Sequence, residues 1–81
     1  MIRWKLSEVM ARHRVLSKDL ADFLSISTNA VSALRKAETM PKIGGVRWVQ
    51  VCEGISALSK IGESVTPFDL IEYIPHPPLS E

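Results

Sequence analysis

Short polar side chains between residues 27 and 36 recur at positions that fall on one side of a helix. Val31 and Leu34 take the inward side, because apolar residues three or four positions apart share a helix face. The outward side then carries Ser27, Thr28, Asn29, Ser32, Ala33 and Lys36. Asn29 is the best suited to read a base, since its amide both donates and accepts and matches the N6/N7 edge of adenine. The chemistry of this side is therefore of a kind that suits contact with the base edges of a double-stranded nucleic acid.

Hydroxyl and basic residues around this helix have the chemistry that phosphate groups need. Thr28 and Ser32 can bond to bases or phosphates, and Ala33 can contact a thymine methyl group. Ser17 and Lys18 stand at the start of the preceding predicted helix, where free backbone N–H groups attract phosphate. The candidate phosphate contacts are Ser17, Lys18, Arg35, Lys36 and Lys42.

Each of these residues also has a plainer interpretation. Ser17 and Ser27 are predicted N-caps of their helices, whatever else they contact. Asn29 and Lys18 can equally be solvated positions, and Arg35 can pair with a nearby acidic residue. The sequence alone leaves these alternatives open.

The elements that position these groups follow from the spacing of apolar residues. We expect a short extended piece at the start, a helix from Leu6 to about Arg14, a helix of about eight residues capped by Ser17, and a third from Ser27 to about Ala37. A break at residues 25–27 separates the second helix from the third. The expected inward residues are Leu6, Val9, Met10 and His13, then Leu20, Ala21, Phe23 and Leu24, and finally Ala30, Val31 and Leu34.

The second half of the chain continues the helical pattern. Residues 38–45, with Pro41 and two glycines, are expected to form a loop. A fourth helix follows, weakened in its middle by Gly54, with Val46, Val49, Cys52, Ile55 and Leu58 inward. Thr66-Pro67 is a strong helix start and predicts a short fifth helix. Residues 71–74 also alternate apolar and polar, so a strand that pairs with residues 2–5 is the alternative there.

Composition narrows the class of protein. The chain of 81 residues is 46% hydrophobic but only 6% aromatic, which favours one domain with an aliphatic, helix-packed core. Residues 1–47 carry nine Lys/Arg against four Asp/Glu, a balance of +5, whereas residues 48–81 carry one against five, a balance of −4. A basic first half suits a protein with one side that faces an anion.

Catalysis is not expected. The sequence has no paired carboxylates, no Gly-rich phosphate loop, no metal-ligand spacing and no nucleophile beside a base, so we predict no enzyme activity, no cofactor and no metal. The single cysteine, Cys52, fits a core thiol and a reducing cytoplasm. His13 is expected to be packed rather than a ligand. No apolar run is long enough to cross a membrane, and no segment resembles a signal peptide.

Several of these residues together resemble a known family. Leu20-Ala21, Ile26-Ser27, Val31-Ser32, Leu34, Pro41 and the segment Thr66–Tyr73 are similar to the Cro/phage-repressor (XRE) type of helix-turn-helix protein, over roughly residues 2–75. The resemblance implies a lambda-repressor-like compact bundle of about five helices, mostly α, as a domain of residues 1–75 with a tail at 76–81. The chain departs from the family at Ser25, where glycine is usual, and by a longer segment 55–65.

The resemblance also implies a function. We expect a sequence-specific DNA-binding transcriptional regulator that inserts helix 27–37 into the major groove and represses as a homodimer on double-stranded DNA. No small-molecule substrate is evident. The pairing surface is expected among Trp4, Trp48, Phe68, Tyr73 and Ile74, and the sequence leaves open which of them the core takes. The alternative is a protein-interaction module, an antitoxin or an adaptor, that keeps the fold without reading DNA.

Overall fold

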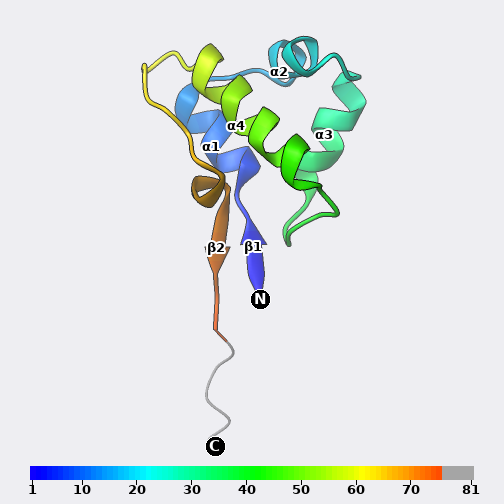
Figure 1. The fold of residues 1–81 in the computed structure, drawn as a ribbon, viewed down its shortest axis with the longest axis vertical. Coiled ribbons are helices and arrows are strands. Elements are labelled where there is room, and N and C mark those ends of the chain that lie inside the picture. The colour runs from blue at the N-terminus through cyan, green and yellow to red at the C-terminus, as the bar shows by residue number, and fades with distance from the viewer. Residues whose placement is uncertain (76–81) are drawn as a thin grey trace, which may run out of the picture.

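A computed structural model describes residues 1–75 of the chain. Within them, four α-helices stack above a small sheet that joins the two ends (Figure 1). The order of elements is β1 (Ile2–Trp4), α1 (Leu6–His13), α2 (Ser17–Leu24), α3 (Thr28–Lys36), α4 (Gly45–Leu58), the 3-10 helix η1 (Pro67–Leu70) and β2 (Ile71–Tyr73). The expectation of a mostly helical fold is confirmed. No helix of the described part is long and apolar enough to cross a membrane.

The first and last elements of the described residues, β1 and β2, form an antiparallel pair, which confirms the strand alternative for the last element. Arg3 lies opposite Glu72 in this register. The other edge of β1 is also occupied, since the Trp4 amide donates to the Glu38 carbonyl at 2.9 Å and the Met40 amide to the Ile2 carbonyl at 3.1 Å. The strand β1 therefore lies between two neighbours, with β2 on one edge and the segment that follows α3 on the other.

The predicted fifth helix is wrong as an α-helix. Pro67 does begin a helical turn, but η1 is a 3-10 helix of four residues. The Thr66 amide donates to Asp69 Oδ2 at 2.9 Å, which fixes the start of this turn. From Ile71 the chain is extended, because its backbone is needed for the ladder with β1.

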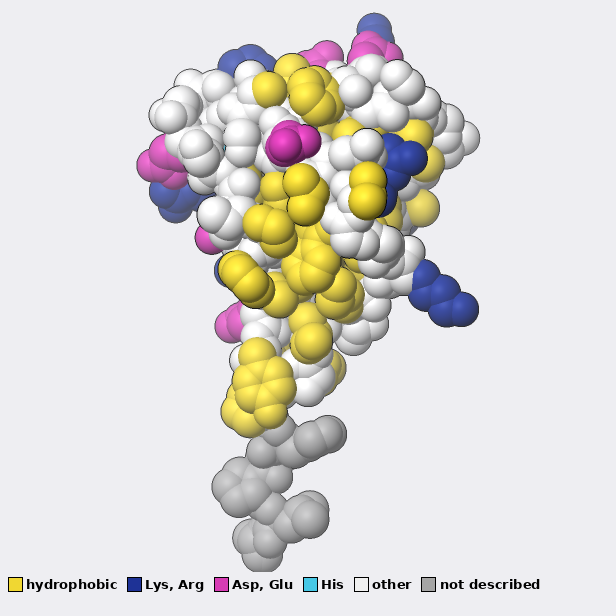
Figure 2. Space-filling view, viewed as in Figure 1, with side chains coloured by type: hydrophobic (Ala, Val, Ile, Leu, Met, Phe, Trp, Pro, Cys, Tyr) yellow, Lys and Arg dark blue, Asp and Glu magenta, His cyan; other side chains and the backbone are white. Residues whose placement is uncertain are grey.

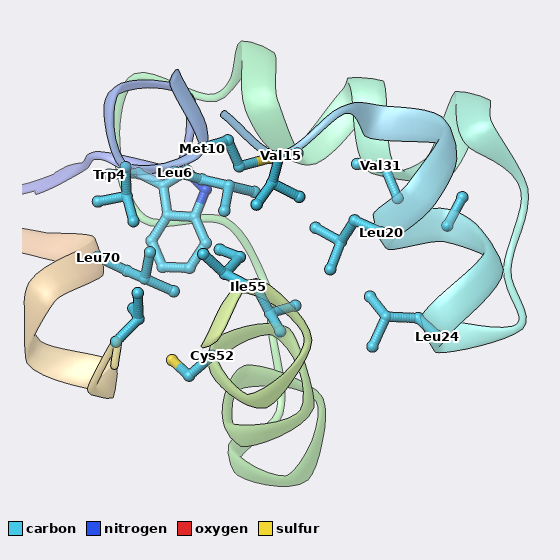
Figure 3. Close-up of a cluster of buried hydrophobic side chains, with 14 residues drawn as sticks. Trp4, Leu6, Met10, Val15, Leu20, Leu24, Val31, Cys52, Ile55 and Leu70 are labelled. Carbon is cyan, nitrogen blue, oxygen red and sulfur yellow. The ribbon is translucent and has the colours of Figure 1, made fainter. Parts of the chain in front are cut away.

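The core lies where the four α-helices and η1 meet (Figure 3). Its fully buried side chains are Leu6, Met10, Leu20, Val31, Val51, Ile55 and Leu70. Trp4 closes the end near the sheet, and its indole Nε1 donates to the Leu34 carbonyl at 3.0 Å. Trp48 packs against Trp4 edge to face, with ring centroids 6.3 Å apart. The core is mainly aliphatic, as the composition predicts.

The inward side of α4 differs from the prediction. Val46 and Val49 are exposed, whereas Val51, Cys52, Gly54 and Ile55 are buried. The predicted three-residue spacing is present in the sequence, but the first turn of α4 extends beyond the core. The helix is instead rotated to bring Gly54 against α2, where a Cβ atom would lie 2.7 Å from Leu20 Cδ1.

Three smaller predictions about the helices are also wrong. Phe23 is 48% exposed, because only one edge of its ring reaches Gly54 while the core side of α2 is filled by Leu20, Ala21 and Leu24. Ala30 is exposed, since Val31 alone in that turn points to the core. Ser17 is not the N-cap of α2, because Leu16 takes that position without a side-chain bond.

The two residues expected in the core without a chemical role are buried. His13 is 4% exposed, and its Nδ1 lies 2.7 Å from the Ser59 hydroxyl. Cys52 is 3% exposed, and burial raises the pKa of its thiol to about 11. A thiol with this pKa is protonated at neutral pH and is a poor nucleophile.

Candidate nucleic-acid interface

The helices α2 and α3 are joined by a tight turn at residues 25–27. Ser25 is left-handed, with φ 56° and ψ 41°, and its amide caps α2 on the carbonyls of Ala21 and Asp22. The Ile26 amide then donates to the Ala21 carbonyl at 3.0 Å, while the Ile26 side chain packs against the core. The left-handed backbone costs Ser more than Gly, and the turn forms nonetheless.

Ser27 starts α3 as predicted. Its hydroxyl accepts from the Ala30 amide at 3.1 Å, which satisfies one of the free N–H groups of the first turn. Val31 is fully buried and Leu34 half-buried, so the helix is held by the side predicted to face inward. This anchoring fixes which side of α3 faces solvent.

The predicted outward side of α3 is open. Thr28, Asn29, Ala33 and Lys36 are exposed, and Ser32 is half-buried. In Figure 1, α3 lies at the side of the molecule, away from β2 and η1. The side chains that the sequence assigns to base contact therefore stand together on an accessible surface.

An open depression of about 270 Å³ lies directly beside this surface. It is lined by Ser7, Ser17, Ser32, Arg35 and Lys36. Arg35 Nη1 donates to the Ser17 hydroxyl at 2.7 Å and so ties α3 to the start of α2. The alternative in which Arg35 pairs with an acidic residue is not seen among the described residues. Hydroxyl groups and two cations around one depression form a favourable place for a phosphate group.

The start of α2 adds to this anion-binding character. Lys18 is exposed in its first turn, and no side chain caps the helix. The first amides of α2 are thus left to solvent or a ligand, and the partial positive charge of the helix end favours an anion there. Lys42 is exposed in the loop between α3 and α4 and does not line the depression, so the structure does not bring it together with the other predicted residues.

A second open depression of about 590 Å³ continues from the first. The two share Ser7, Arg35 and Lys36. Its cationic residues are Arg3, Lys5, Arg35 and Lys36, and its acidic residues are Glu8 and Glu38. Arg3 is bound by Glu72 and Glu8, and these carboxylates raise the pKa of its guanidinium group. One groove that starts beside α3 is thus lined by four of the nine basic residues of the first half of the sequence, Arg3, Lys5, Arg35 and Lys36.

Ser7 is a site residue that sequence reasoning misses. It is exposed in the first turn of α1, and its spacing marks it only as a solvated position. Its place in both depressions depends on how α1 packs against α3, which no local pattern in the sequence reports. Comparisons of the chain with protein-family models, curated proteins and solved structures find no match, so the geometry alone defines this site.

Proposed function

We propose that the protein is a sequence-specific DNA-binding regulator of transcription. In this proposal α2 and α3 are a helix-turn-helix, and α3 enters the major groove with its N-terminal end first. The observation that supports it best is the open side of α3, with Thr28, Asn29 and Ala33 exposed beside a groove lined by hydroxyl and basic groups. A major groove about 12 Å wide admits a helix with such short side chains.

The contacts divide into two kinds in this proposal. Asn29 reads an adenine through paired hydrogen bonds, Ser32 bonds to a neighbouring base or phosphate, and Ala33 contacts a thymine methyl. The backbone is held by the groups around the depression and at the start of α2: Ser17, Lys18, Arg35 and Lys36. Lys42 reaches the backbone from the following loop. Contacts to phosphate fix the position of α3, and contacts to bases select the sequence.

A single helix of this kind reads only a few base pairs. Two copies related by a twofold axis place their α3 helices in successive major grooves, about 34 Å apart on a palindromic site. We therefore propose a homodimer that acts as a repressor by occupying a site that RNA polymerase needs. Basic residues lie around α3, and this uneven distribution of charge supports the proposal that one side of the molecule faces DNA.

A fluorescence anisotropy titration with labelled duplex DNA of mixed sequence at low salt tests this proposal. We expect binding at micromolar protein that weakens steeply as salt rises, because phosphate contacts release counterions. Selection of bound sites from random duplexes should then return a palindromic motif. If micromolar protein leaves the mixed duplex free at low salt, the proposal is wrong.

The same titration decides the alternative function. A protein-interaction module that does not read DNA has one observation in its favour, a wide exposed apolar surface away from α3. Such a module would leave the duplex free at every salt concentration. Binding without any preference in the selected sites would also count against sequence-specific regulation, because it would reduce α3 to a phosphate contact.

A further inference from the structure

Large apolar side chains are exposed along one side of the molecule, over the start of α4, η1 and the end of β2. Val46, Phe68 and Tyr73 are each more than 70% exposed. We call the following residues the apolar face: Val46, Val49, Phe68, Tyr73 and Ile2, which lies opposite Tyr73 in the sheet and so points to the same side. The elements that carry them are adjacent, since α4 contacts η1 and Trp48 Nε1 donates to the Pro67 carbonyl at 3.1 Å. Figure 2 shows hydrophobic side chains in a nearly continuous band down this side.

The apolar face is large for a chain of this size. A complete aromatic side chain presents about 200 Å², so the exposed three quarters of Phe68 and Tyr73 together amount to about 300 Å². Ile2, Val46 and Val49 add to this area. The largest apolar patch on an ordinary monomer is about 300–600 Å², and a standard interface takes about 800 Å² from each partner. The face is therefore as large as the largest patch of an ordinary monomer and supplies a large part of the area that one partner gives to a standard interface.

An open strand edge borders the apolar face. The bonds from the Lys5 amide to the Leu70 carbonyl and from the Ile74 amide to the Met1 carbonyl show that even-numbered residues of this segment face β1. In an antiparallel pair the intervening residues point their backbone groups the other way. The Ile71 carbonyl and both backbone groups of Tyr73 thus lie on the outer edge of β2, where no described segment pairs with them.

We propose that a second copy of this chain docks on the apolar face, beside the edge of β2. An antiparallel strand edge is complementary to itself under a twofold rotation, and so is an apolar face that continues from it. The net charge of +1 does not oppose the approach of two copies. The choice of a second copy rests in part on the proposed function, which needs two chains on a twofold DNA site. The interface lies on elements other than α3 and leaves the open side of that helix free.

Sedimentation equilibrium of the full chain without DNA tests the interface. The wild type should sediment as a dimer of about 18 kDa, twice the chain mass of 9.0 kDa. Val46→Glu and Phe68→Glu should each weaken the dimer by at least about 100-fold, because an unpaired charge is then buried in the interface. Circular dichroism should remain unchanged in both, since these side chains are 76% and 77% exposed in the single chain.

Leu16→Glu is the matched control, because Leu16 is 63% exposed but lies outside the apolar face, and this variant should remain a dimer. Two results overturn the inference: a wild type that stays at monomer mass up to millimolar concentration, or Glu variants that dimerise as the wild type does. Neither result depends on DNA. A dimer that does not bind DNA refutes the proposed function and leaves the interface in place, whereas a chain that is monomeric in solution but binds DNA refutes the interface and leaves DNA binding in place.

Discussion

The burial of Val31 decides, more than that of any other residue, which side of α3 faces solvent. Val31 is fully buried, and this orients the neighbouring side chains of the same turn. Its inward position was predictable, because Val31 and Leu34 are the apolar pair of an otherwise polar helix. Val46 and Phe23 were not predictable in the same way. Their helices carry more apolar residues than the core has room for, so spacing alone does not decide which ones are buried.

Asn29 carries the sequence preference in the proposed function. Asn29→Ala removes the paired bonds to adenine and should cost about 1–3 kcal/mol on the selected site while leaving binding to mixed DNA nearly unchanged. The ratio of the two affinities, measured by anisotropy, reports this loss. An unchanged ratio would remove the role assigned to Asn29. The residue is exposed, so the variant should fold normally.

Gly54 is required by packing rather than by backbone conformation. In Gly54→Ala the new Cβ would meet Leu20 Cδ1 at 2.7 Å and Phe23 Cδ1 at 3.0 Å. Leu20 is fully buried and has little freedom to move, so overpacking of about 1–3 kcal/mol should exceed the gain of about 1 kcal/mol from helix propensity. Urea unfolding should therefore show a lower midpoint.

Gly45→Ala is the control for this effect. A Cβ at Gly45 has nothing within 4 Å, so that variant should unfold at the same or a slightly higher urea concentration. If Gly54→Ala behaves like Gly45→Ala, α4 does not approach α2 as closely as described. The sequence singles out Gly54 only as a weak point of the helix, because a close contact between two helices leaves no local signal.

At the scale of elements, α3 is a short helix that depends on its ends. It has nine residues, too few for stability in isolation, so caps and packing must hold it. Its start was predictable, since Ser27 is a favoured N-cap residue. The start of α2 was not, because Ser17 is equally favoured by type but turns its hydroxyl toward Arg35. Residue type predicts a capping ability, and tertiary contacts decide whether it is used.

Ser27→Ala should lower the free energy of unfolding by about 1 kcal/mol, since the Ala30 amide loses its side-chain acceptor. Thermal unfolding followed by circular dichroism measures the change. Ser25→Gly provides the opposite comparison in the same turn. Glycine relieves the strain of the left-handed backbone at φ 56°, but it also has more conformational entropy in the unfolded state. We expect the two effects together to stabilise the protein by about 0.5 kcal/mol. A stabilised Ser27→Ala would show that the cap contributes nothing.

At the scale of the whole molecule, the two halves of the sequence differ in charge, and four of the nine basic residues of the first half line the groove beside α3. The sequence predicted this polarity and the helical order, because both follow from composition and local spacing. It did not predict the groove, the contribution of Ser7 or the exposed start of α4. These features depend on the angles at which helices pack, and packing angles are set by many residues together.

Lys18 tests the electrostatic side of the proposed function. Lys18→Ala should weaken binding to all DNA sequences about equally and reduce the slope of log affinity against log salt by about 1, because one phosphate contact is lost. Arg12→Ala makes the same change in charge at the end of α1, where Arg12 pairs with Glu63 and lies outside the groove, and should leave the slope unchanged. Equal slopes for both variants and the wild type would contradict the placement of DNA at the start of α2.

The pairing of β1 with β2 has a consequence for how the chain assembles. Arg3 and Glu72 are 69 positions apart, whereas α2 and α3 are neighbours along the chain. Local pairs close quickly and distant ones late, so α2 and α3 can pack first and the strands last. During synthesis on the ribosome, the end of the core at Trp4 therefore stays uncovered until the segment that contains η1 and β2 has been made. A nascent chain cut short before residue 70 would expose the indole of Trp4 and one open edge of β1, so the described part of the chain completes its fold only after β2 has been made.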